Sequence, residues 1–265
     1  MGELVFVGLG LHDEKGISLR GLEEAESADA VFIELYTSFM PNFSVEGFER
    51  VVGKKIHVVS RRQLEDENGK VVLDAAVRGK AVLLVPGDPL IATTHVALRL
   101  EAAKRGVRTR IVHAASIISA VIGLCGLHNY KFGKSVTIPF PSNFSETPYM
   151  VVAQNKKLGL HTLCLLDIDA EGNRHLSLRE ALEMLLTVEE KKRMNIVTNE
   201  TLAVGVARAG SSNPKVKAGS VRELLGYDFG GPPYSLVFPG KLHFMEAEAL
   251  IAFAWAPLSV RRFVE

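Results

Sequence analysis

Short apolar runs alternate with segments of helical periodicity along the whole chain. The first half contains five strand-like runs, and the run at 81–85 is apolar throughout, as expected of a strand buried on both faces of a parallel sheet. These runs are residues 4–7, 30–35, 55–59, 81–85 and 109–113. Helices are expected between them, over 19–28 after a Ser18 cap, over 71–78 before Gly79, and over 96–103 after a cap at Thr93 or Thr94. The order predicts an α/β domain, and the charged segment 61–70 is interpreted as a loop.

The second half repeats this pattern with more hairpin-like connections. Ser116 is expected to cap an apolar helix over residues 117–125, which leads into a second domain. Strands are predicted at 161–167, 202–207 and 235–238, and helices at 150–158, after Ser177, and at 244–254. We therefore expect two α/β domains, residues 1–113 and 114–265, with a ligand cleft between them.

The stretch KAVLLVPGDPLIATTH, residues 80–95, is where the first domain is expected to meet a ligand. Pro86 and Gly87 break the strand, and Gly87 can adopt a positive φ without a Cβ clash. Asp88 then lies at the carboxyl end of a central strand, where open α/β sheets bind ligands. The loop has no glycine run and no lysine, so it does not form a phosphate cradle. A carboxylate there suits a cationic or hydroxyl-bearing ligand.

The glycine pair after the first strand is a weaker signal. Gly8 and Gly10 fit half of a dinucleotide-binding fingerprint, but the third glycine is missing. A close backbone approach to a ligand and a tight turn without one are both consistent with the pair.

Composition excludes several classes of protein. The formal net charge of +1 argues against a nucleic-acid-binding field over the whole protein. No apolar run approaches the roughly 20 residues of a membrane span, and the N-terminal sequence does not read as a signal peptide, so a cytoplasmic location is expected. Cys125 and Cys164 lie in apolar surroundings without metal-like spacing, so they are expected to be buried thiols and no metal site is predicted.

Six motifs in order carry a resemblance to a known family. They are VGLGLHDEKGISLRGLEEAESADAVF, LVPGDPLIATTH, HAASIISAVIGLCGLHNYKFGK, GLHTLCLLDI, VARAGS and DFGGPPYSLVFPGKLHFMEAEAL. With them the chain resembles the diphthine synthases, the archaeal methyltransferases of diphthamide biosynthesis, within the tetrapyrrole-methylase fold family. Corrinoid-pathway relatives typically continue the first loop with Pro-Gly. Leu11-His12 stands there instead, which points away from a corrinoid substrate.

The resemblance implies methyl transfer from S-adenosylmethionine to the amino group of the 3-amino-3-carboxypropyl-histidine intermediate in elongation factor 2. The trimethylated product is diphthine, and S-adenosylhomocysteine is released. It also implies a homodimer with the cofactor in the interdomain cleft. The cofactor contacts carried over by motif are Leu11, Asp88, Ile91, Ser116, Ile117, Leu166, Ala209 and Tyr234. No catalytic side chain is assigned.

Several residues keep two interpretations at this point. Asp88 and Ser116 could hold the cofactor or cap the following helix. Histidines at element ends could transfer protons, but such histidines are more often structural; they are His95, His113 and His243. Aromatic residues could line a site for a cationic product or pack in the core; they are Tyr36, Phe39, Tyr130, Phe140 and Phe144. Arg61-Arg62 with the following acids, and Arg108 with Arg110, could dock the protein substrate or form solvated faces.

Three other functions remain open from the residues. They are a corrinoid methylase of the same fold, an RNA ribose methylase, and a nucleotide-binding module that docks on a translation factor without chemistry. The near-neutral charge disfavours the RNA methylase.

Overall fold

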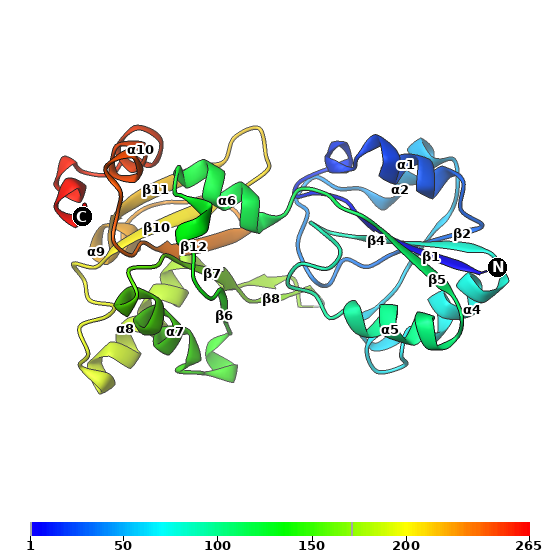
Figure 1. Cartoon of the computed structure of the whole chain (residues 1–265), viewed down its shortest axis with the longest axis horizontal. Helices are drawn as coiled ribbons and strands as arrows, with labels where there is room; N and C mark the ends of the chain where they lie inside the picture. Colours follow the sequence, from blue (N-terminus) through cyan, green and yellow to red (C-terminus); the bar gives the residue numbers. More distant parts are fainter. Residues whose placement is uncertain (1, 171) are drawn as a thin grey trace. The chain divides into compact units, whose positions relative to one another are not determined.

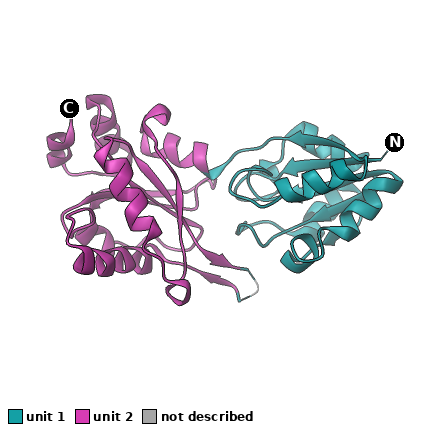
Figure 2. Cartoon of the chain, turned by 60° about the horizontal axis from the view of Figure 1, so that its bottom comes forward, with its two compact units in different colours: residues 1–117, 170–172 teal, residues 118–169, 173–265 magenta. Residues whose placement is uncertain are grey.

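The computed structural model describes residues 2–170 and 172–265, which form two compact units (Figure 2). Within these residues, unit 1 runs through Ile117 and includes Ala170 and Gly172, and unit 2 holds the remainder. No helix in the described part of the chain is long and apolar enough to cross a membrane.

Unit 1 is built on a five-stranded parallel sheet with the order β3-β2-β4-β1-β5. Its strands are β1 (Glu3–Gly8), β2 (Ala30–Ile33), β3 (Ile56–Val58), β4 (Lys80–Val85) and β5 (Arg108–Val112). Its helices are α1 (Leu19–Glu26), α2 (Val45–Val52), α3 (Arg61–Leu64), α4 (Lys70–Arg78) and α5 (Val96–Lys104), with the 3-10 turn η1 (Glu14–Gly16). Figure 1 shows α1 and α2 on one face of this sheet and α4 and α5 on the other.

The continuous apolar runs of the central strands follow from burial on both faces. In β1, Leu4 and Phe6 pack in a core with residues of α4 and α5, whereas Val5 and Val7 pack in a separate core with α1 and α2. All four side chains are 0% exposed. Because successive side chains of a strand point to opposite faces, a strand between two helical layers needs apolar residues at every position.

Unit 2 contains a mixed five-stranded sheet with the order β11-β10-β12-β7-β6, in which only the β6–β7 pair is parallel. Its strands are β6 (Val136–Ile138), β7 (Thr162–Leu166), β10 (Leu202–Ala207), β11 (Lys215–Ser220) and β12 (Tyr234–Phe238), and β8 (Ile168–Asp169) pairs with β9 (Arg174–His175). Its helices are α6 (Ile117–Cys125), α7 (Thr147–Lys157), α8 (Leu178–Lys192), α9 (Val221–Leu225) and α10 (Phe244–Ala254), with 3-10 turns η2 (Asn129–Lys131), η3 (Pro141–Asn143) and η4 (Leu258–Phe263). The predicted α/β class is confirmed.

Several local predictions are confirmed as well. Ser18 caps α1 by accepting from the Gly21 backbone at 3.1 Å, and Ser177 forms a capping box with Glu180 at the start of α8. The last helix has the predicted bounds. Cys125 and Cys164 are free and buried, and burial raises the pKa of each thiol to about 12.

Two predictions in unit 1 were wrong. The segment 61–70 is not entirely loop, because Ser60 and Gln63 form a capping box that starts α3. Neither Thr93 nor Thr94 caps α5, whose N-cap residue is His95 without a side-chain cap bond. The Thr93 hydroxyl donates instead to the Pro89 carbonyl at 2.8 Å, and the Thr94 hydroxyl donates to Glu65 at 2.8 Å.

Candidate functional site

The loops that follow β1 and β4 meet at the carboxyl edge of the unit 1 sheet. The two strands are neighbours, and the chain leaves β1 towards α1 on one face but leaves β4 towards α5 on the other. A crevice opens at such a switch point in α/β sheets. Here Gly10 and Gly87 pair across the two loops, with N–H to carbonyl distances of 3.3 and 2.6 Å. Both glycines have positive φ, 77° and 69°, which side-chain-bearing residues rarely adopt.

Asp88 is the predicted residue that this edge buries most clearly. It is 6% exposed, and its Oδ1 accepts from the Leu90 backbone at 3.2 Å. The Nδ1 of His113, at the end of β5, lies 2.7 Å from the Asp88 Oδ2, so this nitrogen donates to the carboxylate. Asp88 therefore stabilises its own turn and also ties the ends of β4 and β5 together.

A second buried carboxylate lies at the same edge and was not predicted. Glu34 directly follows β2 and is 0% exposed. Its Oε2 accepts from the Tyr36 and Thr37 backbones, each at 3.0 Å, and the Thr37 hydroxyl donates to Oε1. The His95 Nε2 lies 3.2 Å from Oε1, and His95 is itself 2% exposed. The sequence signal was an acidic residue at the end of an apolar strand.

The buried pair of Glu34 and His95 connects the loop after β2 to the start of α5. The Tyr36 ring lies edge-on to His95 with centroids 6.3 Å apart, and the Arg61 guanidinium lies over Tyr36 at 5.2 Å. Burial, followed by the nearby Glu34 charge, raises the pKa of Tyr36 well above its usual range. His95 and His113 are thus both engaged by carboxylates.

The remaining unit 1 candidates flank this edge. Leu11 follows Gly10 in the bend before η1, and Ile91, 40% exposed, lies three residues beyond Asp88. The Ile91 backbone N–H donates to the Asp88 carbonyl at 3.3 Å. Ser116 and Ile117 follow β5 at the start of α6. All five unit 1 candidates therefore lie in or directly after loops that follow β1, β4 and β5.

The three unit 2 candidates gather at one end of the second sheet. Tyr234 opens β12 and pairs with Ala207 of β10, and the next residue, Ser235, pairs with Leu165 of β7. Leu166 ends β7, and Ala209 lies two residues after β10. Arg208 has a positive φ of 53° and donates to the carbonyls of Phe229 and Gly231 at 3.0 and 2.8 Å. The Tyr234 hydroxyl donates to the Gly230 carbonyl, and burial raises its pKa.

The other unit 2 candidates are each engaged by another group of the unit. His243 caps α10 through its side chain and backbone. Phe140 is stacked by Arg174 at 4.4 Å, and Phe144 by Lys191 at 5.0 Å. Tyr130 is 79% exposed and contacts His128. These aromatic side chains do not form one box.

The predicted docking arginines of unit 1 are mostly paired within the unit. Arg110 binds Glu3 at 2.8 Å and Glu24 at 2.6 Å, at the amino-terminal end of the sheet. Hydrogen bonds from Arg110 hold the pKa of Glu24 at about 2 despite burial. Arg61 and Arg62 pair with Glu65 and Glu67 on the surface. No group of three or more potential metal ligands lies among the described residues.

Comparison with known proteins identifies the family. The sequence model of the family Tetrapyrrole (Corrin/Porphyrin) Methylases matches residues 3–225. This range includes all the candidate residues of both units except Tyr234. The chain belongs to this tetrapyrrole methylase family.

Within this methylase family, the chain is similar to diphthine synthases over nearly its whole length. It is 48% identical to the diphthine synthase of Methanosarcina mazei, over 99% of this chain and 100% of that protein. It is 44% identical to the enzyme of Methanothermobacter thermautotrophicus, over 97% of each chain. A crystal structure of diphthine synthase matches with a TM-score of 0.90 at 44% identity, over 98% of this chain and 99% of that one. The resemblance predicted from the motifs is confirmed.

Proposed function

We propose that this methylase transfers methyl groups from S-adenosylmethionine to the amino group of the 3-amino-3-carboxypropyl-histidine intermediate in elongation factor 2. Three transfers give diphthine, and each releases S-adenosylhomocysteine. The observation that carries the proposal is the similarity to diphthine synthases at 44–49% identity over 93–99% of the chain. The departure from Pro-Gly after Gly10 supports a substrate other than a corrinoid.

The carboxyl edge of the unit 1 sheet has the chemistry that this cofactor requires. A Cβ placed on Gly87 would meet no atom within 4 Å, so open space adjoins the backbone there. Asp88 accepts two hydrogen bonds in the structure, which leaves lone pairs on its oxygens for a further donor. The ribose hydroxyls and the amino group of S-adenosylmethionine are such donors.

The proposal uses residues from both units, with a cofactor cleft between domains 1–113 and 114–265. Leu11, Asp88, Ile91, Ser116 and Ile117 would hold the cofactor from unit 1, and Leu166, Ala209 and Tyr234 from unit 2. Glu34 and His95 would fix the neighbouring loops without contacting the cofactor.

Bound S-adenosylmethionine supplies a methyl carbon that its sulfonium already activates. The chain therefore needs no nucleophile of its own, and its task is to hold the acceptor amine in line with that carbon. Positioning of this kind contributes up to about 7–11 kcal/mol. In that transfer the amine lone pair would form the new N–C bond as the C–S bond breaks, and the electron pair of that bond would remain on sulfur.

Proton removal from the amine does not require a side chain. An amine with a pKa of about 8 is free in roughly a tenth of molecules at pH 7, and water accepts the proton before each attack. His95 and His113 both contact carboxylates at this edge. The proposal therefore assigns neither histidine as the base that removes the proton.

Formation of S-adenosylhomocysteine with different acceptors tests the proposal. The purified protein and S-adenosylmethionine are incubated with elongation factor 2 bearing the intermediate, with a precorrin, and with neither. Product is expected only with the factor. Product only with the precorrin would assign a corrinoid methylase. Absence of cofactor binding in calorimetry would assign a binding module without chemistry.

The proposal also includes a homodimer, as the family resemblance implies, and a cytoplasmic location, as expected from the sequence. Light scattering coupled to size exclusion checks the first point, with twice the 28.9 kDa chain mass expected.

A further inference from the structure

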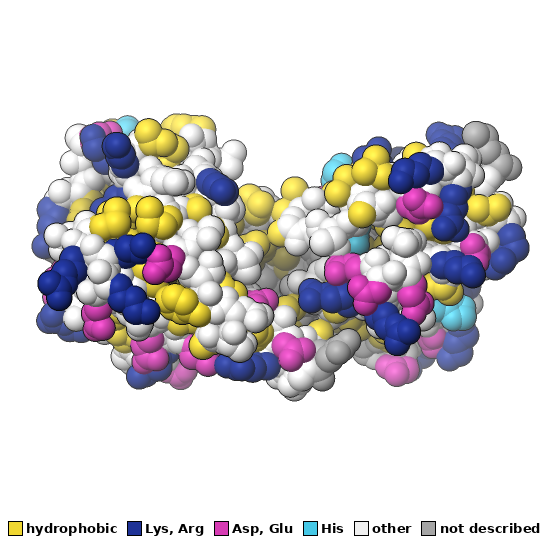
Figure 3. All heavy atoms as spheres, turned by 90° about the horizontal axis from the view of Figure 1, so that it is seen from below, with side chains coloured by type: hydrophobic (Ala, Val, Ile, Leu, Met, Phe, Trp, Pro, Cys, Tyr) yellow, Lys and Arg dark blue, Asp and Glu magenta, His cyan; other side chains and the backbone are white. Residues whose placement is uncertain are grey.

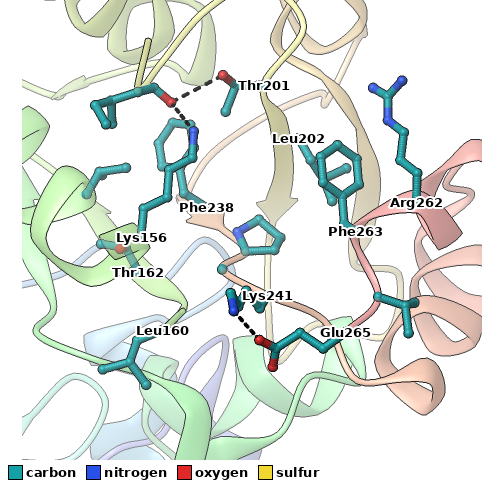
Figure 4. A pocket seen from close by; sticks show the side chains of 15 residues that line it. Lys156, Leu160, Thr162, Thr201, Leu202, Phe238, Lys241, Arg262, Phe263 and Glu265 are labelled. Atoms are coloured by element: carbon teal, nitrogen blue, oxygen red, sulfur yellow. Dashed lines mark hydrogen bonds and ion pairs between the residues drawn. The ribbon is translucent and has the colours of Figure 1, made fainter. Parts of the chain in front are cut away.

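Unit 2 contains a cavity of about 400 Å³ that none of the preceding assignments uses (Figure 4). It lies where β7 and β10 begin and β12 ends, next to Thr162, Leu202 and Phe238. Phe238 pairs with Thr162, whereas the cofactor candidate Tyr234 lies at the other end of β12. At roughly 3.4 Å per residue, these two ends of β12 are about 14 Å apart. The cavity is therefore distinct from the predicted cofactor contacts of this unit.

The walls of the cavity are mainly apolar. Side chains from α7, the loop after it, the segment after α8, the strands and the C-terminal segment line it: Val152, Leu160, Ile196, Leu202, Phe238 and Phe263. Its volume lies in the range of pockets that enclose small organic ligands, which are likewise lined by apolar side chains with few polar groups. An apolar portion of a ligand would be removed from water there.

The C-terminal wall is held in place by backbone pairing. The Leu242 N–H donates to the Phe263 carbonyl at 3.0 Å, and the Glu265 N–H donates to the Leu242 carbonyl at 3.0 Å. Lys241 and Glu265 also form an ion pair. The segment that closes this side is thus part of the fold of unit 2, and the cavity is preformed.

The charges around the cavity are unbalanced in favour of cations. Lys156, Lys241 and Arg262 line it against one acidic side chain, Glu265, which Lys241 already neutralises. The Lys156 ammonium donates to the Ile196 and Asn195 carbonyls at 3.1 and 3.4 Å, and the Arg262 guanidinium lies 4.9 Å from the Phe263 ring centroid. Among the described residues, neither cation has a carboxylate at ion-pair distance.

Lys156 and Arg262 are both exposed, so they lie on the solvent side of the cavity. Figure 4 shows them on opposite sides of it. Desolvation by the surrounding protein lowers the pKa of Lys156. An anion placed near this ammonium would offset that desolvation.

We propose that this cavity binds a small amphipathic anion, with its apolar chain against Leu202 and Phe238 and its carboxylate or phosphate group at Lys156. The apolar chain of such a ligand would pack against the apolar walls. Its anionic group would give Lys156 the ion-pair partner that it lacks among the described residues. The Glu189 carboxylate compensates this ammonium only in part, since desolvation still lowers the pKa of Lys156. A neutral ligand would add nothing to that compensation, and a cationic ligand would be repelled by the ammonium.

Calorimetry with octanoate on the full-length protein tests the proposal, with octanol and octylammonium as neutral and charge-reversed probes. Octanoate is expected to bind at least fivefold more tightly than either. Lys156→Met is expected to weaken octanoate at least fivefold. Lys157→Met, which changes the neighbouring exposed lysine outside the cavity lining, is expected to leave binding unchanged. Tighter binding of octyl phosphate than of octanoate would identify phosphate as the preferred group.

Four results would overturn the proposal. They are no octanoate binding at millimolar concentration, equal binding of octylammonium, equal effects of the two lysine variants, and loss of binding as the protein self-associates at higher concentration. The last result would identify a second copy of the chain as the occupant. Saturating octanoate should leave the affinity for S-adenosylmethionine unchanged. Direct competition between the two would show that this cavity is part of the cofactor site.

Discussion

Two buried carboxylates at the carboxyl edge of the unit 1 sheet organise the loops around it. Asp88 joins the ends of β4 and β5 through His113, and Glu34 joins the loop after β2 to α5 through His95. Asp88 was predictable because its turn residues and its place after an apolar strand are local in sequence. Glu34 and His95 are 61 residues apart, and no local pattern reports a contact over that distance.

Asp88→Asn tests the role of the first carboxylate at nearly constant size. The amide is a weaker acceptor and adds a donor, so we expect the affinity for S-adenosylmethionine to fall about tenfold, which is about 1.4 kcal/mol. Calorimetry measures the affinity, and circular dichroism checks the fold. Wild-type affinity in a folded variant would show that the Asp88 carboxylate does not bind the cofactor.

Gly87→Val tests the turn, and Gly106→Val is a matched control. Both glycines have a φ of 69° and no atom within 4 Å of an added Cβ, so both variants carry similar backbone strain of about 1–2 kcal/mol. Gly106 lies before β5, at the opposite edge of the sheet. Both variants should lose similar stability in chemical unfolding, but only Gly87→Val should weaken cofactor binding. Equal cofactor affinities of the two variants would contradict a role of the loop after β4 in binding the cofactor.

At the scale of elements, the burial of a strand determines how clearly the sequence predicts it. Strands β1 and β4 are buried on both faces, so they appear as continuous apolar runs and were predicted. Strand β11, with the sequence KVKAGS, mixes buried and half-buried positions, and only the last residue of β6 is buried, so neither appears as an apolar run and neither was predicted. Helix α3 was missed although Ser60 and Gln63 carry the S-x-x-Q signature of a capping box.

Helix α10 is anchored by a buried carboxylate that the sequence did not single out. Glu246 is 0% exposed and accepts from His161 Nε2 at 2.9 Å, Lys131 Nζ at 2.8 Å and the His128 backbone at 2.7 Å. The His161 Nδ1 accepts from the Gly240 backbone, so its Nε2 carries the proton. Burial raises the pKa of Glu246, but these hydrogen bonds outweigh it and hold the pKa well below the usual range.

Glu246→Gln is expected to destabilise unit 2 by about 3–5 kcal/mol, because it leaves Lys131 without its buried partner. Since the folded pKa of Glu246 is depressed, its contribution is present above the unfolded pKa of about 4.3 and is lost as pH falls below it. The variant should therefore lose less stability on acidification than the wild type. Unfolding by denaturant at several pH values measures both effects.

Glu248→Gln, on the same helix, is the control for that experiment. Glu248 pairs with Arg261 on the exposed side of α10, so its loss should have a much smaller effect. Equal losses in the two variants would contradict the anchoring role of Glu246.

At the scale of the whole molecule, charge gives little indication of a partner. Figure 3 shows basic and acidic side chains interspersed over one face, in keeping with the net charge of +1. The face shown has no basic stripe of the kind expected of a nucleic-acid-binding surface. The fold class and the family could be predicted from the sequence because apolar patterning and the six motifs extend along nearly the whole chain. No such pattern in the sequence marks a docking surface for the proposed protein substrate.

The central claim is that this protein methylates the modified histidine of elongation factor 2. Intact-mass spectrometry of the factor bearing the unmethylated intermediate, after incubation with this protein and S-adenosylmethionine, tests it most directly. We expect mass increments of up to three methyl groups, localised by peptide fragmentation to the modified histidine, and none when the cofactor is omitted. An unchanged mass with a protein that binds the cofactor would contradict the account.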